Sequence, residues 1–119
     1  MRSLRLLAAA ACLVVTTSAF ADALEGRFRV QGTDPGTGEK YSGTVAIEKT
    51  GQVTYRLVWQ IGDTRYIGTG IGSPSGLAVS YKAGSETGIG IYSQEGDKFA
   101  GFWTYAGGKT VGQETWTAR

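Results

Sequence analysis

Histidine is absent from this 119-residue chain, and cysteine, methionine and proline are scarce, with one, one and two residues. Histidine is the side chain that most often transfers protons near neutral pH, and its imidazole is the commonest metal ligand. The single cysteine, Cys12, lies near the N-terminus, so the rest of the chain has no thiol and can form no disulfide. We therefore expect a non-enzyme without metal or cofactor, which folds without the disulfides common in small exported domains.

The first 21 residues have the layout of a secretory signal peptide. Arg2 and Arg5 precede an apolar run over residues 6–15, and a small-x-small cleavage pattern ends at Ala21. The run is shorter than the roughly 20 residues of a membrane-spanning helix. Cys12 lies inside the run, which is too early for a lipid-attachment cysteine. We expect an exported protein, periplasmic or secreted, in which residues 22–119 form a single domain without a membrane span.

Neither sign of charge is in excess in this expected domain. Without Arg2 and Arg5, ten basic residues face ten acidic ones. Nucleic-acid binding depends on a basic surface that contacts phosphates. We therefore expect no nucleic-acid partner.

The longest regular pattern is an alternation within residues 52–72. Large apolar residues occupy every second position, namely Val53, Tyr55, Leu57, Trp59 and Ile61. Successive side chains of a strand point to opposite faces, so these five share one face. The turn residues 62–64 then lead into a second β-rich run. The pattern predicts a long antiparallel hairpin in which Trp59 is buried and Arg56 is exposed.

Shorter alternating runs fill the rest of the domain. We expect strands at residues 24–30, 41–47, two within 52–72, and then 77–81, 88–93, 98–105 and 110–117. Eight short strands with short connections predict an all-β fold, a small up-and-down antiparallel β-barrel, with a β-sandwich as the alternative. Closing the sheet removes exposed edges, which favours the barrel. Most strands are shorter than the roughly 9–11 residues of an outer-membrane strand.

Aromatic residues recur two positions from glycines, as in Tyr66-x-Gly68 and Gly101-x-Trp103. Glycine weakens a strand, so its repeated use indicates a bend or the close approach of a neighbour. The rings either form a packed core, which we favour, or line a cavity for one small apolar ligand, which eight strands can just enclose. The residues of such a site would be Tyr55, Trp59, Tyr66, Trp103 and Glu114.

Glu114 stands out among the carboxylates, most of which lie in turns. It has the same parity as Gly112 and Trp116, so it either points into the barrel near one mouth or sits at the fraying end of the last strand. A buried carboxylate needs a partner. The candidate partners are Arg27, Arg29 and Arg65.

Segments spread over the domain resemble a family of small exported bacterial proteins labelled fibronectin-binding. Among them are Tyr41-Ser-Gly-Thr-Val, Tyr66-Ile-Gly-Thr-Gly and Gly101-Phe-Trp-Thr. The resemblance implies a protein partner, extracellular or in the envelope, and assigns no site residues. The opening Leu24-x-Gly-x-Phe28 is similar to that of avidin-type and lipocalin-type barrels. Residues 31–35 do not match the avidin biotin loop, so biotin binding is not implied.

These observations predict an exported, soluble, non-catalytic binding module. A protein partner would contact loops on a rigid scaffold, for which the candidates are residues 32–40 and 82–87. The alternative function is that of a carrier for one small apolar ligand in the barrel.

Overall fold

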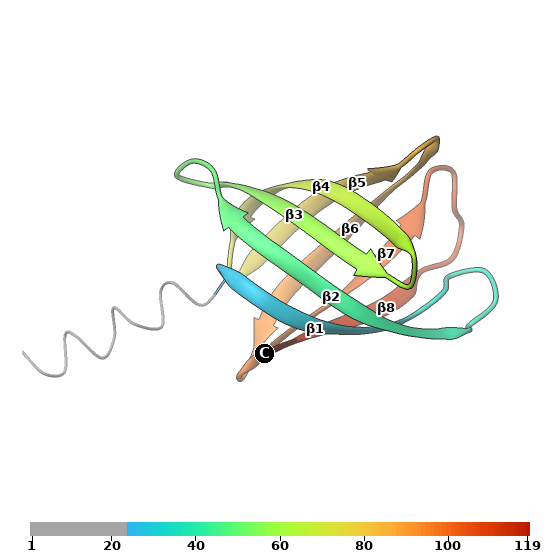
Figure 1. Ribbon diagram of the computed structural model, residues 1–119, viewed down its shortest axis with the longest axis horizontal. Helices are drawn as coiled ribbons and strands as arrows, with labels where there is room; N and C mark the ends of the chain where they lie inside the picture. Colours follow the sequence, from blue (N-terminus) through green and yellow to red (C-terminus); the bar gives the residue numbers. More distant parts are fainter. Residues whose placement is uncertain (1–23) are drawn as a thin grey trace, which may run out of the picture.

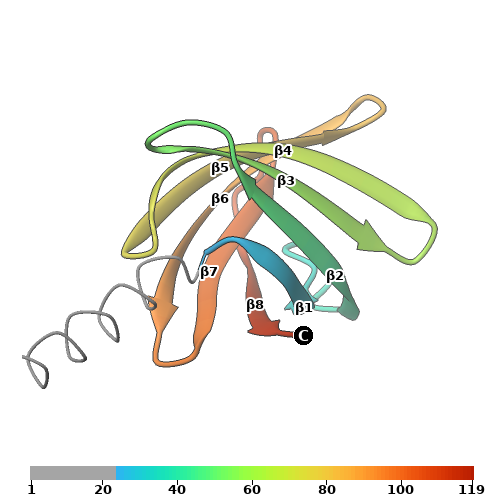
Figure 2. The same ribbon diagram turned by 60° about the vertical axis from the view of Figure 1, so that its left-hand side comes forward.

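The computed structural model describes residues 24–119, and the predicted signal peptide lies outside the described residues. Eight antiparallel strands follow one another around a closed barrel (Figures 1 and 2). They are β1 (Gly26–Thr33), β2 (Lys40–Lys49), β3 (Thr54–Ile61), β4 (Thr64–Ser73), β5 (Gly76–Ala83), β6 (Glu86–Glu95), β7 (Lys98–Tyr105) and β8 (Gly112–Ala118). β1 pairs with both β2 and β8, which leaves no free edge. The predicted up-and-down barrel is confirmed, and the sandwich alternative is wrong.

Alternation along the strands separates the inside of the barrel from the outside. In β3, Trp59 is 5% exposed, whereas its neighbour Gln60 and the nearby Arg56 are exposed, as predicted. Val53 departs from the expected inward stripe, with 51% of its surface exposed. It precedes β3, and its carbonyl accepts a hydrogen bond from the Gly72 amide at 2.9 Å, so it lies outside the pleated part of the strand.

Residues 82–87 do not form the predicted loop. Lys82 pairs with Thr87 and Ala83 with Glu86, so both strands extend to a two-residue turn. Gly84 opens this turn with a φ of +60°, the left-handed conformation that tight hairpins require. The polar residues here belong to solvent-exposed strand ends.

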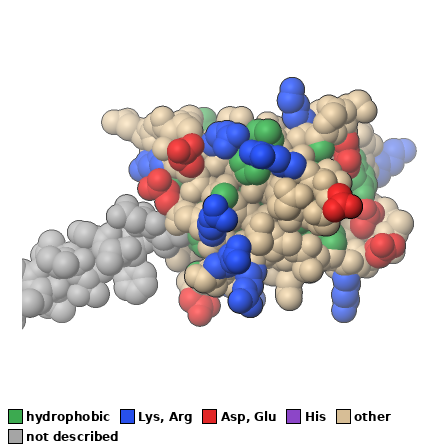
Figure 3. Space-filling model, in the orientation of Figure 1, with side chains coloured by type: hydrophobic (Ala, Val, Ile, Leu, Met, Phe, Trp, Pro, Cys, Tyr) green, Lys and Arg blue, Asp and Glu red, His purple; other side chains and the backbone are tan. Residues whose placement is uncertain are grey.

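The outer surface is polar and charged over much of its area. Figure 3 shows the face that carries β1 to β4 at the front in Figure 1. Lysine and arginine side chains cross the middle of this face, and acidic side chains lie towards its two ends. None of the described residues forms a helix long and apolar enough to cross a membrane.

The interior of the barrel differs along its length. We call the end with the β2–β3, β4–β5 and β6–β7 turns the packed half, because buried apolar side chains fill it. They include Leu24, Phe28, Ile47, Leu57, Leu77, Phe99 and Trp116, none of which is more than 5% exposed. We call the opposite end, on the right in Figure 1, the open half. The β1–β2, β3–β4, β5–β6 and β7–β8 connections surround its mouth.

Rings lie across glycines of the neighbouring strand. Tyr41 is paired with Gly32, Tyr81 with Gly88, Tyr92 with Gly101 and Trp103 with Gly112, and each ring lies next to its glycine. Trp59 lies against Gly68, where an added Cβ atom would stand 2.6 Å from its ring. The glycines therefore provide the space in which the rings lie flat against the barrel wall.

Candidate ligand-binding cavity

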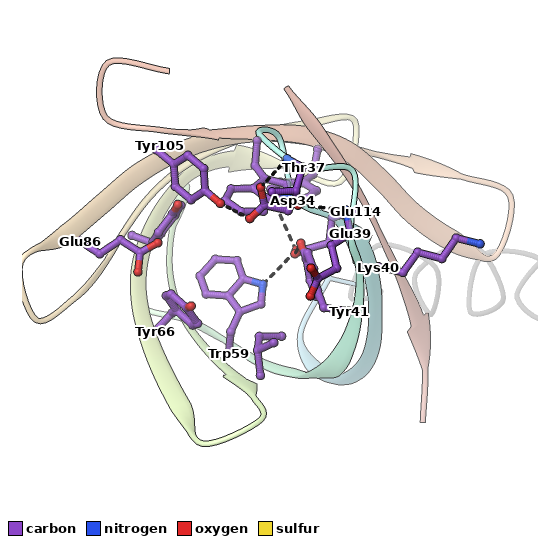
Figure 4. A pocket seen from close by; sticks show the side chains of 14 residues that line it. Asp34, Thr37, Glu39, Lys40, Tyr41, Trp59, Tyr66, Glu86, Tyr105 and Glu114 are labelled. Atoms are coloured by element: carbon purple, nitrogen blue, oxygen red, sulfur yellow. Dashed lines mark hydrogen bonds between the residues drawn. The ribbon is translucent and has the colours of Figure 1, made fainter. Parts of the chain in front are cut away.

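The open half contains a cavity of about 360 Å³ (Figure 4). Six aromatic side chains from five different strands form most of its wall, and we refer to them as the aromatic wall: Tyr41, Trp59, Tyr66, Tyr81, Trp103 and Tyr105. Small-molecule sites are typically concave, mostly apolar and supplied with a few convergent polar groups. The cavity has this character.

Tyr81 joins the wall together through edge-to-face contacts. Its ring centroid lies 5.7 Å from that of Tyr66, 6.0 Å from that of Trp103 and 6.3 Å from that of Trp59. Trp103 contacts Tyr41 and Tyr105 in the same way, at 6.0 and 5.3 Å. Edge-to-face pairs are the preferred arrangement of aromatic rings. Each ring of the wall is therefore held by at least one other.

Glu114 forms the floor of the cavity and is 5% exposed. Its Oε1 accepts hydrogen bonds from Trp59 Nε1 at 3.0 Å, Trp116 Nε1 at 2.8 Å and the Tyr92 hydroxyl at 3.1 Å. Its Oε2 accepts one from the Tyr41 hydroxyl at 2.5 Å. Four donors thus converge on this carboxylate, three on Oε1 and one on Oε2. Glu114 therefore points into the barrel, which was one of its two predicted orientations.

The prediction that an arginine side chain pairs with Glu114 is wrong. Arg27, Arg29 and Arg65 have the opposite parity in their strands and are exposed on the outside. The observed partners are two phenols and two indoles, all neutral. Burial, followed by the negative charge of Glu114, raises the pKa of Tyr41 and Tyr92 above the ordinary value, which keeps both hydroxyls protonated as donors.

The loop between β1 and β2 borders the mouth and is fixed by Asp34. The Oδ1 atom of Asp34 accepts hydrogen bonds from the amides of Gly36 and Thr37 at 2.8 and 3.1 Å, and its Oδ2 accepts one from the Tyr105 hydroxyl. The Thr110 hydroxyl donates to the Pro35 carbonyl at 2.7 Å, which ties this loop to the β7–β8 connection. The mouth is therefore built from two loops that hold each other.

Asp34 and Tyr105 shift each other's pKa through their hydrogen bond. The hydrogen bond from Tyr105 is the largest cause that lowers the pKa of Asp34. Burial and the same bond raise the pKa of Tyr105 to about 12. Burial, followed by the charge of Glu86, raises the pKa of Tyr66 and Tyr81. The tyrosines of the wall thus stay neutral, while carboxylates lie close to them.

Two polar atoms in the wall lack hydrogen-bond partners. The Tyr81 hydroxyl and the Trp103 indole nitrogen are buried without one. Buried polar groups are normally satisfied, so each such atom calls for an explanation. No group of three or more potential metal-binding side chains occurs among residues 24–119.

Four of the five predicted site residues line the cavity: Trp59, Tyr66, Trp103 and Glu114. Tyr55 does not, because it is buried at the other end of β3, opposite Gly70 in the packed half. The sequence reasoning missed Tyr41, Tyr81, Tyr92, Tyr105 and the loop residue Asp34. Tyr41 could have been found from the sequence, because it lies two positions from Gly43. Tyr81 has no glycine at that spacing, and its pairing with Gly88 becomes visible only when β5 and β6 are aligned.

Comparison with known proteins gives the fold and no family. No family model matches this chain, and no curated protein matches it. Among solved structures, the chain is similar to a redesigned β-barrel, b11L5F_LGL, with a TM-score of 0.72 and 17% identity. The match covers 83% of this chain and 94% of that one. At this identity the likeness shows a shared eight-stranded barrel, and the resemblance to proteins labelled fibronectin-binding stays a prediction.

Proposed function

We propose that the barrel is a non-catalytic binding protein that holds one small, largely apolar ligand in its open half. The observation that carries this proposal is the cavity of about 360 Å³ lined by the aromatic wall. A volume of this size falls within the range of small-molecule sites. The packed half supports the expected packed core, and the open half supports the alternative of a ligand cavity.

The wall is arranged before a ligand enters. Glu114 fixes the polar ends of Tyr41 and Trp59, and ring contacts hold the other four residues. Binding normally costs free energy for ordering side chains, about 0.5–1.5 kcal/mol for each flexible one. Since these rings are already ordered, little of that cost remains.

The unpartnered atoms of Tyr81 and Trp103 indicate that the ligand is not a pure hydrocarbon. An indole N–H only donates, and a phenol can donate or accept. A ligand with one hydroxyl or carbonyl group can satisfy one of these atoms after a small side-chain rotation. We therefore expect a compact apolar body with one polar group.

Nuclear magnetic resonance of the three indole N–H groups tests the proposal. The probes are benzyl alcohol, choline, the uncharged alcohol in which carbon replaces the choline nitrogen, and the carboxylate of the same shape. We expect at least one probe to shift the Trp59 and Trp103 signals saturably, while amides of the packed half around Phe99 stay in place. If no probe of the panel produces a saturable shift, the proposal is wrong.

A pair of adjacent residues provides the matched control. Tyr66 lines the cavity, whereas Ile67 is 42% exposed on the outside. Tyr66→Ala should weaken binding of the best probe severalfold, and Ile67→Ala should leave it unchanged. Equal effects of the two substitutions would place the binding site outside the barrel.

The predicted protein partner has weaker support. Residues 82–87 are a hairpin end, and the loop of residues 32–40 is tied down at the cavity mouth. An apolar row does cross the outside, where Ile71, Ala78, Ile91 and Phe102 are successive cross-strand partners, but nothing on that face indicates what would cover it. The protein partner, the exported location and the lack of catalysis stay predictions.

A further inference from the structure

The floor of the cavity carries a negative charge without a counter-ion. Glu114 is buried, and its four hydrogen-bond donors are neutral groups. Hydrogen bonds from neutral donors stabilise a carboxylate but leave its net charge in place. The field of this charge therefore extends into the cavity, where few polar groups screen it.

The rim adds further negative charge. Asp34, Glu39 and Glu86 line the cavity near its mouth, whereas Lys40 is the only basic residue of the lining. Lys40 extends away from the centre of the cavity in Figure 4. The lining thus has four carboxylates and one ammonium group, and that ammonium group points outward.

The wall itself favours a cation. Tyrosine and tryptophan rings carry negative potential on their faces and attract ammonium groups, with about 0.5–2 kcal/mol for each well-placed pair. Seven such rings line one cavity here, the six of the aromatic wall and Tyr92. Rings arranged as a cage, together with nearby carboxylates, form the arrangement that recognises substituted ammonium ions.

We infer that the ligand of the open half is an organic cation, a compact ammonium group with apolar substituents and one hydroxyl or carbonyl group. This inference rests on the proposed function and names the chemical class of its ligand. The cation would lie among the rings above Glu114, compensating its charge. Its polar group would satisfy the free atom of Tyr81 or that of Trp103.

Three probes of one shape separate this inference from the proposed function. They are choline, the uncharged alcohol in which carbon replaces its nitrogen, and the corresponding carboxylate. Titration calorimetry with the purified protein should show choline binding about tenfold more tightly than the uncharged alcohol, the ratio that about 1.4 kcal/mol produces. The carboxylate should bind most weakly.

The outcomes are distinguishable. If the uncharged alcohol binds as tightly as choline or more tightly, the inference is wrong and the proposed small-molecule site stands. If no probe, benzyl alcohol included, binds in calorimetry or in the indole spectra, both are wrong.

A substitution at the rim tests the role of charge without disturbing the wall. Glu86 is exposed at the mouth, and Glu48 is exposed on the outside of β2. Glu86→Gln should weaken choline binding about two- to threefold, as expected for one partly screened charge, and should leave the uncharged alcohol unaffected. Glu48→Gln is the control and should change neither. A loss of both ligands in Glu86→Gln would indicate a structural effect and contradict the electrostatic role.

Discussion

The two halves of the barrel share one architecture but differ in what fills them. Both are built from the same eight strands, but in the open half rings lie across glycines, whereas at Gly70 in the packed half leucine and valine side chains do. In the packed half, aliphatic side chains such as Leu57, Leu77 and Val79 fill the space between the rings. The open half has only Ile61 in that role among its lining residues. The barrel geometry therefore permits a cavity in either half. The side chains at one end decide whether that half is filled.

Glu114 lies on the boundary between the halves. Trp116 belongs to the packed half and Trp59 to the aromatic wall, and both indoles donate to the same oxygen of Glu114. A polar network of this kind is favourable only when each member has its partners, and Glu114 meets that condition. The carboxylate therefore connects a structural core to a candidate binding site.

The largest loss of stability should come from truncating a large side chain in the packed half. Trp116 is fully buried, stacks on Tyr92 at 4.2 Å and contacts Phe28 and Phe99. Trp116→Ala should lower the free energy of unfolding by about 3–5 kcal/mol. The equivalent truncation in the open half, Tyr66→Ala, should cost about 1 kcal/mol, because that ring is half-buried and faces a cavity. Urea unfolding of the two variants measures the difference, and equal losses would show that the halves are not distinct.

The second largest effect should come from removing the carboxylate at the boundary. Glu114→Ala leaves buried indoles and phenols without an acceptor, so we expect a loss of about 2–4 kcal/mol. Glu114→Gln should cost much less, because the amide oxygen can replace Oε1 and the Tyr41 hydroxyl can turn to accept from the amide nitrogen. Thermal and urea unfolding compare the two. A glutamine variant as unstable as the alanine variant would mean that the charge itself, and not the acceptor, holds the network.

Glycine substitutions should have the next largest effect. A Cβ atom at Gly101 would stand within 3 Å of the Ile91 carbonyl oxygen and of the Tyr92 ring, whereas one at Gly76 would meet no atom within 4 Å. We expect Gly101→Ala to destabilise the barrel by about 1–3 kcal/mol through overpacking. Gly76→Ala is the control and should change stability by less than about 0.5 kcal/mol. If both variants unfold at the same urea concentration, the rings do not need the glycines beneath them.

The smallest effects should appear in the pH dependence of the open half. Tyr105 has a pKa raised to about 12, so the stability it contributes is complete below its unfolded value near 10 and is lost as pH rises through about 12. Asp34 has a lowered pKa, so its contribution is present above its ordinary value near 3.8 and disappears as pH falls through the lower folded value. Tyr105→Phe should reduce both dependences, which phenolate absorbance and acid unfolding can follow. If acid unfolding is the same in Tyr105→Phe as in the unchanged protein, the loop amides, and not Tyr105, lower the pKa of Asp34.

The sequence alone determined the fold because alternation needs only neighbouring residues. The inward parity of Tyr55, Leu57 and Trp59, and the turns between the strands, follow from local periodicity, and the structure confirms both. The same parity also indicated Trp59, Tyr66 and Trp103 as inward residues before any contact was known, whereas for Glu114 it left two alternatives open. Val53 and residues 82–87 were misjudged because a strand end depends on backbone pairing with the next strand.

Only the tertiary structure decided where the cavity lies and what surrounds Glu114. Parity gives the face of a strand but not the height of a residue along the barrel, so Tyr55 and Trp59 could not be separated from sequence although they lie in different halves. The register between strands sets that height, and it also determines which ring covers which glycine. Glu114 gains three of its four donors from β2, β3 and β6, and no local pattern relates residues so far apart in the chain. Only the fourth donor, Trp116, is a neighbour in the same strand.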